Sequence, residues 1–495
     1  KRQGQNHIVD KVVDKVTYEN GEKADVTWYQ FRIPIFDYDD IEGDISDFKT
    51  IRFMRMFMTG FEDTTFLRFA RLDLVREEWR RYQYPLVQGG EDWTGVEPPL
   101  GALAISAVNI EENSGKEPVN YVLPPGFDRQ NHPMQPQLRQ LNEQSSVLKV
   151  DELADGDARA AYKNTQLDMR QYKKLRMEAH AEAITGEVLE NNQLVAFIRL
   201  GTDYKDNYYE YEVPLELTPP GRYDNDSESD RQIVWPGSNQ FEVVLDDFKE
   251  LKQARNRAMS DPESDVAVSS VYSEIDEEGN RISVTGNPNL SSVRTIMIGV
   301  RNPKAGNNPY GPDDGLPKSG EIWLNELRLT DFNDHGGWAA NGRASLKLAD
   351  FGNVTFAGNT SQPGFGSIEQ KIQERQLEQI IQYDISGNLQ MGKFFKQESG
   401  VNIPVFASYS KAIVNPEYNP LDPDVPLKEA IDEAETEAER DSIIRNARDV
   451  VERKAFAVTN VRMNKSGNKK HFYSLSNWST SFSMNEMQSR NPNLN

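Results

Sequence analysis

The sequence predicts an all-β protein, in which jelly-roll-like β-sandwich modules are followed by antiparallel strands of an incomplete, large outer-membrane β-barrel. Three observations lead to this prediction. An apolar-alternating motif recurs at long spacing, short strand-like segments separated by turn residues fill the first 335 positions, and longer alternating segments follow them. The 26 prolines and 33 glycines among 495 residues also suit a fold with many turns.

The recurring motif is a short run in which apolar and basic residues alternate. It occurs at 48–54 (FKTIRFM), 172–177 (YKKLRM) and 293–298 (VRTIMI), at intervals of 124 and 121 residues. The first and third copies lead into a second alternating segment, at 67–75 and 322–329. A strand pair that recurs at such spacing indicates repeated structural modules rather than a single catalytic domain.

Three regions follow from these patterns. Residues 1–98 are expected to be the C-terminal part of one β-sandwich module, and 99–335 a nearly whole second, jelly-roll-like module. Residues 336–495 are expected to be a transmembrane β-barrel segment with a helical insertion near 427–455, where apolar residues keep helical spacing. The expected elements of the first two regions include strands at 28–35, 103–110, 171–183, 194–202, 207–216, 241–245 and 282–285, a last pair ending at 332, and a short helix near 157–164.

The segments after His335 alternate more cleanly than those before it. One face is apolar and the other carries small polar residues, over 9–13 residues, which is typical of transmembrane barrel strands. A sheet with one wet face is the commoner cause of alternation, but Lys and Glu rather than Asn, Ser, Gln and Thr would then be expected on that face. The predicted lipid-facing residues are Leu346, Leu348, Ile385, Leu389, Val401 and Val405, and the predicted lumen-facing ones are Ser386, Asn388 and Gln390.

The predicted barrel strands number roughly six, which is too few to close. Outer-membrane barrels begin at about eight strands, and an open edge would leave backbone groups unpaired in lipid. The rest of the barrel is therefore expected outside these 495 residues. The partial sandwich module at the other end, and a first residue that is Lys1 rather than Met, favour the same interpretation. The sequence is expected to be a piece of a larger protein.

Charge and composition exclude several classes of function. The formal net charge of −22 repels phosphate backbones, so no nucleic-acid partner is expected. Cysteine is absent, which excludes disulfides, thiolate catalysis and Cys-ligated zinc. No apolar run approaches the roughly 18 residues that a membrane helix needs.

The sequence predicts no catalytic, cofactor-binding or metal-binding residues, and the chain is not expected to be an enzyme. The five histidines are scattered, and neither a G-x-S-x-G motif nor a Walker A motif occurs. Two acidic loops, at 37–44 and 224–228, begin like calcium-binding loops but lack the glycine and the bidentate glutamate at the required positions. A solvated acidic turn is the default interpretation of each, and a structural ion is the alternative.

Aromatic residues on a jelly-roll surface would be the means of binding sugar rings. The candidates are Trp28, Tyr29, Tyr208, Tyr209, Tyr211 and Trp323. Because several occupy equivalent positions of two similar segments, 28–35 and 208–215, packing in the core is the stronger interpretation. The alternative function that stays open is a soluble cell-surface jelly-roll protein that binds glycans.

A set of short motifs resembles the SprA (Sov) family. The motifs are VNIEEN at 108–113, PVNYVLPPG at 118–126, NEQS at 142–145, GDAR at 156–159, YKKLRM at 172–177, HAE at 180–182, FIRLG at 197–201, NYYEYEVPL at 207–215 and EIWLNELRL at 321–329. Each one alone is a weak signal. Together they are specific and cover 103–332, with less distinct similarity on both flanks.

Members of that family are outer-membrane translocons of the type IX secretion system in Bacteroidota, and some are required for gliding motility. The resemblance implies a protein-conducting channel for folded proteins in the bacterial outer membrane, with soluble modules in the periplasm or at the cell surface. It also implies as partners a PorV-like shuttle protein, a periplasmic plug protein, secreted cargo with C-terminal secretion domains, and outer-membrane lipid. The family is not enzymatic, and this chain is far shorter than its members.

Overall fold

The computed structural model shows two compact units, Lys1–Val75 and Arg76–Asn495. The residues that it describes are 7–18, 21–31, 33, 54–64, 66–70, 72, 79–82, 86, 103–129, 142–184, 186, 189–306, 308–311, 314–371, 374–434, 436–464 and 471–491. Every sheet formed by these residues is antiparallel and open. The predicted all-β class is therefore confirmed.

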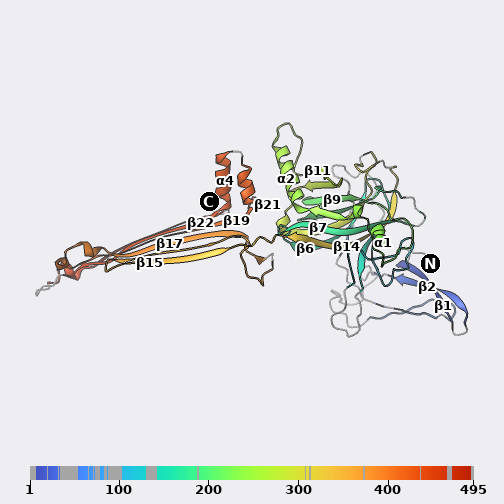
Figure 1. Ribbon diagram of the computed structural model, residues 1–495, viewed down its shortest axis with the longest axis horizontal. Helices are drawn as coiled ribbons and strands as arrows, with labels where there is room; N and C mark the ends of the chain where they lie inside the picture. The colour runs from blue at the N-terminus through green and yellow to red at the C-terminus, as the bar shows by residue number, and fades with distance from the viewer. Residues whose placement is uncertain are drawn as a thin grey trace. The chain divides into compact units, whose positions relative to one another are not determined.

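The first unit contains a β-hairpin, formed by β1 (Ile8–Thr17) and β2 (Lys23–Phe31) (Figure 1). Its register pairs Val12 with Trp28, and Gly21 takes the positive φ of +83° that the turn requires. The strand expected at 28–35 thus starts earlier and ends at Phe31. Sequence patterning does not predict β1, because its alternating Lys and Asp residues weaken the apolar signal.

The first copy of the repeated motif falls largely outside the described residues. Of 48–54 only Met54 is described, and of 67–75 only 67–70 and 72, and none of these positions lies in a strand. The second and third copies begin β7 and β13, which belong to different sheets. The motif therefore recurs within one sandwich as well as before it, and does not mark one copy per module.

Two sheets of the second unit form a β-sandwich. The five-stranded sheet has the order β10-β7-β14-β5-β4, and its strands are β4 (Leu103–Asn109), β5 (Gln144–Leu153), β7 (Tyr172–Ala183), β10 (Phe241–Val244) and β14 (Lys318–Phe332). The seven-stranded sheet has the order β11-β12-β9-β8-β13-β6-β3, and its strands are β3 (Arg80–Arg81), β6 (Ala158–Leu167), β8 (Val195–Gly201), β9 (Tyr208–Pro214), β11 (Tyr272–Ile275), β12 (Arg281–Thr285) and β13 (Val293–Arg301). Many neighbouring strands are distant in sequence, as in Greek-key sandwiches.

The facing sides of these two sheets share one hydrophobic core. Leu148 and Met177 from the five-stranded sheet pack in the same buried cluster as Ile198 and Ile298 from the seven-stranded sheet. Each such side chain contributes about 1.5–3 kcal/mol by leaving water. Burial of alternate residues thus fixes the register of the sandwich strands.

Two α-helices lie beside the sandwich strands. In α1 (Glu228–Val234) the Ser227 hydroxyl accepts a hydrogen bond from the Asp230 amide and caps the helix. In α2 (Leu245–Ser260) the apolar residues recur every three positions, and the ring of Phe248 stacks on Tyr209 with centroids 4.9 Å apart. This stripe packs α2 into the core that the two sheets share. Short 3-10 turns occur at η1 (Gly237–Asn239) and η2 (Leu290–Ser292).

The expected helix near 157–164 is wrong, because this segment forms strand β6. Its alanines favour a helix in isolation. In the folded chain β6 pairs with β13 over its length, and Ala158 and Ala160 are completely buried. Tertiary pairing therefore overrides local propensity at this position.

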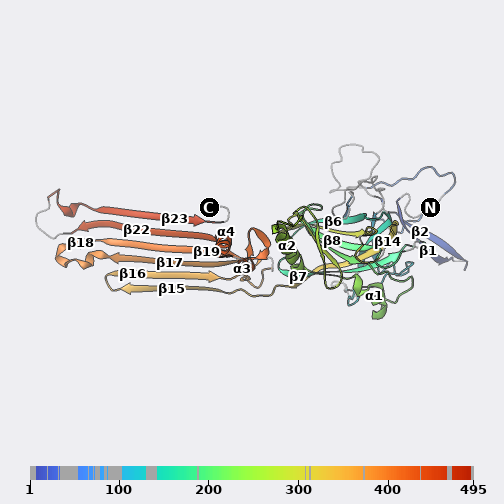
Figure 2. The same cartoon turned by 90° about the horizontal axis from the view of Figure 1, so that it is seen from above.

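A long sheet follows the sandwich in sequence and consists of neighbouring strands joined up and down (Figure 2). Its strand order is β15-β16-β17-β19-β22, with β18 and β23 both paired to β22. The strands are β15 (Ala339–Leu348), β16 (Gly352–Ser361), β17 (Glu378–Gln390), β18 (Val401–Asn402), β19 (Pro404–Pro416), β22 (Asp449–Met463) and β23 (Thr480–Arg490). Short 3-10 turns occur at η4 (Met391–Phe394), η5 (Gln397–Ser399) and η6 (Leu475–Asn477).

One connection of this sheet carries secondary structure of its own. Between β19 and β22 lie the small strands β20 (Tyr418–Asn419) and β21 (Asp422–Pro426), followed by helices α3 (Leu427–Asp432) and α4 (Glu437–Ala447). The helical insertion expected near 427–455 is present but is shorter and split in two. It ends at Ala447, because β22 begins at Asp449 and pairs with β19.

Candidate functional site

The long sheet has two chemically different faces. One row of residues that pair across four neighbouring strands lies on the apolar face and consists of Ala344, Phe356, Ile385 and Tyr409. The adjacent row lies on the opposite face and consists of Ser345, Thr355, Ser386 and Ser408. The hydroxyls of Ser345 and Thr355 lie 3.2 Å apart and hydrogen-bond across the strands. A row of hydroxyl groups therefore crosses four strands directly behind the apolar row.

The apolar face is exposed in the chain by itself. Leu346 is 63% exposed and Ile385 is 46% exposed, although both belong to well-paired strands. Contiguous apolar surface of this kind marks a site of contact with another apolar medium or protein.

Most of the residues predicted to face lipid do share this face. The register places Leu346, Leu348, Ile385, Leu389 and Val405 on it, and places Ser386, Asn388 and Gln390 on the other. Val401 lies outside the register of β19, because it belongs to the separate strand β18 and pairs with Met463. The chain leaves the β17–β19 alignment at this point through η4 and η5.

The connection between β19 and β22 is attached to the sandwich through a buried carboxylate. Asp424 of β21 accepts hydrogen bonds from the Tyr209 hydroxyl at 2.6 Å and from the Leu290 amide at 2.6 Å. The ammonium group of Lys252, on α2, lies 3.2 Å from the same carboxylate and 2.8 Å from that of Asp422. Because the Asp424 side chain is wholly buried, these donors replace its water completely.

Further contacts surround this anchor. Arg170 donates to the Pro423 carbonyl at 3.1 Å, and its guanidinium group lies 4.0 Å from the centre of the Tyr418 ring. Beyond β21, Lys249 of α2 and Glu429 of α3 form an ion pair at 3.2 Å. The sequence gives no signal for this junction, since Asp424 looks like one more acidic residue in a proline-rich loop.

The sandwich buries a ladder of charges on the side of its seven-stranded sheet that faces away from the core. Glu210 lies between Arg199 and Arg301, and Glu212 lies between Arg301 and Arg281. Burial by itself would raise the pKa of Glu210, but the two guanidinium groups outweigh it and lower that pKa to about 2. The Glu210 carboxylate is thus ionised, and both carboxylates are paired with arginines, which is a structural role.

A second buried cluster contains His180, which is completely buried. The His180 ring stacks on Trp323 with centroids 3.8 Å apart, and its Nδ1 lies 2.7 Å from the Val234 carbonyl. Its Nε2 is 3.6 Å from Glu182, which also pairs with Lys116. Burial opposes ionisation of Glu182, but His180 and Lys116 outweigh it and lower the pKa of this carboxyl group. No other histidine joins this cluster among the residues that the structure describes.

The aromatic residues considered for sugar binding lie mainly in the core. Tyr208, Tyr209, Tyr211 and Trp323 are at most 6% exposed. Trp28 and Tyr29 are half-buried in β2. A ring that binds sugar must present its face to solvent, so the observation on which glycan binding depends is absent for the four sandwich residues.

The acidic loop at 224–228 is explained by the start of α1. The Asp224 carboxylate accepts from the Asp226 amide at 3.0 Å, and Asp230 accepts from the Asp224 amide at 2.8 Å. The loop is therefore a helix cap of the kind that Asp and Ser favour. The other acidic loop, at 37–44, lies outside the described residues. Within the described part of the chain, no three His, Asp or Glu side chains are grouped to hold a metal ion.

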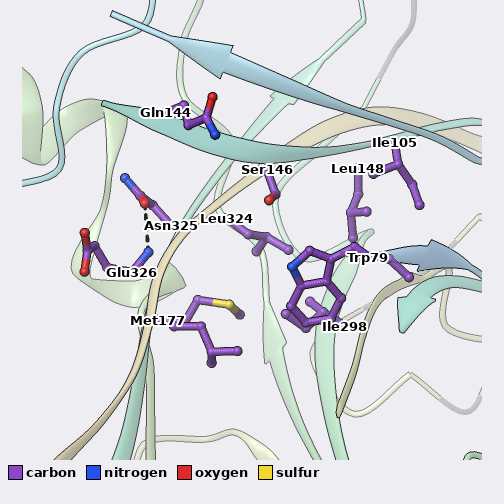
Figure 3. A pocket seen from close by; sticks show the side chains of 12 residues that line it. Trp79, Ile105, Gln144, Ser146, Leu148, Met177, Ile298, Leu324, Asn325 and Glu326 are labelled. Atoms are coloured by element: carbon purple, nitrogen blue, oxygen red, sulfur yellow. Dashed lines mark hydrogen bonds between the residues drawn. The ribbon is translucent and has the colours of Figure 1, made fainter. Parts of the chain in front are cut away.

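A cavity of about 160 Å³ opens between the two sheets of the sandwich (Figure 3). Trp79, Met177 and Ile298 line its apolar side, while Asn325 and Glu326 lie on its polar side. Glu326 has a positive φ of +53° at an irregularity in the pairing of β14 with β7. The volume is well below the roughly 300–1,000 Å³ of typical ligand sites, so the cavity does not accommodate a drug-sized molecule.

Comparison with known proteins agrees with these features. A family model named SprA_N and described as motility related/secretion protein matches residues 2–431, which include the sandwich and the first strands of the long sheet. No curated protein matches the chain. Among the described residues no helix is both long and apolar enough to cross a membrane. The family is one of motility and secretion components rather than of enzymes, and the chain belongs to this SprA_N family.

Proposed function

We propose that the chain is a structural part of a protein-conducting channel in the bacterial outer membrane, serving type IX secretion of folded proteins and gliding motility. The observation that supports this most is the two-faced long sheet, in which exposed apolar side chains back directly onto hydroxyl and amide side chains. Strands of 10 to 15 residues are long enough to cross the apolar part of a bilayer when tilted. Family membership supports the secretion role.

The proposed mechanism is steric rather than chemical. The apolar face contacts lipid, and the opposite face lines an aqueous lumen with short polar side chains such as Ser386 and Asn388. Such groups keep their own water and bind passing protein surfaces weakly, because an exposed neutral hydrogen bond contributes only about 1 kcal/mol. Cargo can then pass without being trapped. The sandwich is held to this sheet by the anchor at Asp424.

The proposed partners are a PorV-like shuttle, a periplasmic plug protein and cargo with C-terminal secretion domains. These rest on the family resemblance and on the need of any wide lumen for closure when idle. Strands at both edges of the long sheet would pair with further strands of the same barrel.

Site-specific photo-crosslinking in secreting cells tests this proposal. A photoreactive amino acid at Ser386 is expected to crosslink to secreted cargo, because this position faces the lumen. The same amino acid at the adjacent Ile385 is the matched control, and is expected to give no cargo adduct because it faces lipid. Equal cargo adducts at both positions, or recovery of the protein in the soluble fraction, would contradict the proposal.

A further inference from the structure

The first unit carries an apolar segment that the described residues do not cover. Six of its large side chains, between 51% and 90% exposed, are Met54, Met56, Phe57, Phe66, Phe69 and Leu72. Residues 54–58 and 66–70 belong to no sheet that the described residues form, and their backbone groups have no hydrogen-bond partner among those residues. Exposed apolar side chains mark a contact site, and an unpaired backbone can accept a further strand.

This segment corresponds in sequence to β13 and β14 of the sandwich. The motif at 48–54 matches 293–298 at the start of β13, and 67–75 matches 322–329 within β14. Both β13 and β14 are interior strands, since β13 pairs with β6 and β8, and β14 pairs with β5 and β7. As a result Leu324 is only 6% exposed, whereas Phe69 at the matching position is 63% exposed.

The hairpin of the first unit corresponds to β8 and β9. The segment 28–35 is similar to 208–215, and both end in an apolar-Pro-apolar sequence. Because β2 thus matches β9, its antiparallel neighbour β1 matches β8, the antiparallel neighbour of β9. Only 12 residues, 36–47, follow before the next matching segment. The strands of the sandwich that lack room there are β10, β11 and β12, which lie at the edges of their sheets.

The same correspondence shows which neighbours the first unit needs. The counterpart of β13 needs a strand in the place of β6, and the counterpart of β14 needs strands in the places of β5 and β7. Neither described strand of the unit takes these places, because β1 and β2 pair with each other. The connection 59–65 can join two facing sheets, since its seven residues reach about 23 Å when extended and packed sheets lie about 10 Å apart.

We infer that the first unit is part of a second β-sandwich and binds a partner segment of three antiparallel strands, in the places of β5, β6 and β7. The segment 144–183, which holds these strands in the described sandwich, shows the chemistry of such a partner. Its Leu148 and Met177 pack in one cluster with Ile322 and Leu324, and its backbone pairs with both sides of β14. Strand addition of this kind uses main-chain hydrogen bonds for affinity and alternate side chains for specificity.

The partner segment is distinct from 144–183, because that segment is already paired within its own sandwich. The inference concerns the first unit alone and does not rest on the role proposed for the long sheet. The two can therefore fail independently.

Amide hydrogen exchange in the full protein, as isolated from its cells, tests the inference without any substitution. The amides of 54–58 and 66–70 are expected to be protected as strongly as those of β13 and β14, because all would lie in interior strands. Exchange as fast as in the connection at 61–64 would overturn the inference. Lipid or a helix covering the side chains would give this fast exchange, since neither pairs with the backbone.

Cysteine labelling tests the burial of the side chains. The 495 residues contain no cysteine, so Phe69→Cys and Glu62→Cys each introduce a single site among them. In the folded full protein, labelling by a water-soluble maleimide is expected to be lost at Phe69→Cys and kept at Glu62→Cys, which lies in the connection. Both should label equally after denaturation. Equal labelling in the folded protein would overturn the inference.

Photo-crosslinking identifies the partner. A photoreactive phenylalanine derivative at Phe66 keeps the aromatic ring, and its adduct can be sequenced by mass spectrometry after digestion. The expected adduct is a peptide in which apolar residues alternate and which is not part of 144–183. An adduct with 144–183 of a second copy would replace the inferred partner by strand exchange between copies. An adduct with lipid alone would also overturn the inference.

Discussion

The sandwich and the long sheet share the same alternation of apolar and polar residues, but the apolar face is covered in the sandwich and exposed in the long sheet. In the sandwich, Ile198 and Ile298 are at most 4% exposed, because a second sheet covers them. In the long sheet, Leu346 and Ile385 occupy equivalent positions of paired strands and remain exposed. Alternation therefore indicates that the two faces of a strand meet different environments. It does not identify the medium that the apolar face contacts.

The residues on the other face distinguish the two regions. Behind the core, the sandwich carries Arg199 and Glu210, which satisfy one another in a dry environment. Behind its apolar face, the long sheet carries Ser345 and Thr355, which need only water or a single partner. In the sandwich the polar groups behind the core are charged, paired and buried, whereas at these positions of the long sheet they are short and uncharged.

The largest expected difference between the regions concerns two tryptophans. Trp323→Ala leaves a cavity in the sandwich, where the side chain is completely buried, and is expected to lower the free energy of unfolding by about 3–5 kcal/mol. Trp338→Ala, at the exposed start of the long sheet, is expected to change it by less than about 0.5 kcal/mol in detergent. Urea-dependent proteolysis of the sandwich measures both. Similar losses would show that Trp338 is packed in a core.

Acid is expected to destabilise the sandwich through Glu210. Because folding lowers the pKa of this carboxyl group from 4.5 to about 2, its contribution is fully present above about pH 4.5 and is lost as pH falls toward 2. A shift of that size corresponds to roughly 3 kcal/mol. Glu210→Gln should flatten the acid limb of stability against pH, whereas Glu242→Gln, at a far more exposed carboxylate, should leave the slope nearly unchanged. An unaltered slope in Glu210→Gln would refute this assignment.

The anchor of the β19–β22 connection is expected to be weaker than either sheet. Asp424→Asn removes the charge that faces the buried Lys252 but keeps an acceptor for Tyr209, so a loss of about 2 kcal/mol in local stability is expected. Amide hydrogen exchange in 418–426 measures it. Asp422→Asn, at a partly exposed partner of the same lysine, is the control and should have a smaller effect. Equal protection in both variants and the wild type would mean that the anchor contributes nothing.

The sequence predicts those elements whose signal is local. The strands expected at 171–183 and 194–202 appear as β7 and β8 within one residue at each end. Helix α2 carries a detectable stripe, Leu245, Phe248 and Leu251, that short-strand patterning overlooks. By contrast, β6 is a strand only because β13 pairs with it.

The candidate site is predictable in part for the same reason. The two faces of β17 follow from alternation within one strand, so Ile385 and Ser386 can be assigned from the sequence. The anchor at Asp424 cannot, because its three donors come from β9, α2 and the segment before β13.

Adjacent residues of β17 give the most direct test of the comparison. Ile385→Arg places a charge on the lipid face, where it is expected to reduce assembly by about 2 kcal/mol relative to Ser386→Arg on the lumen face. The fraction of folded protein in the outer membrane measures this difference. In water the order would reverse or vanish, because the exposed Ile385 side chain gains solvation when it becomes charged. The sign of the difference therefore distinguishes a lipid environment from an aqueous one at a single pair of neighbouring side chains.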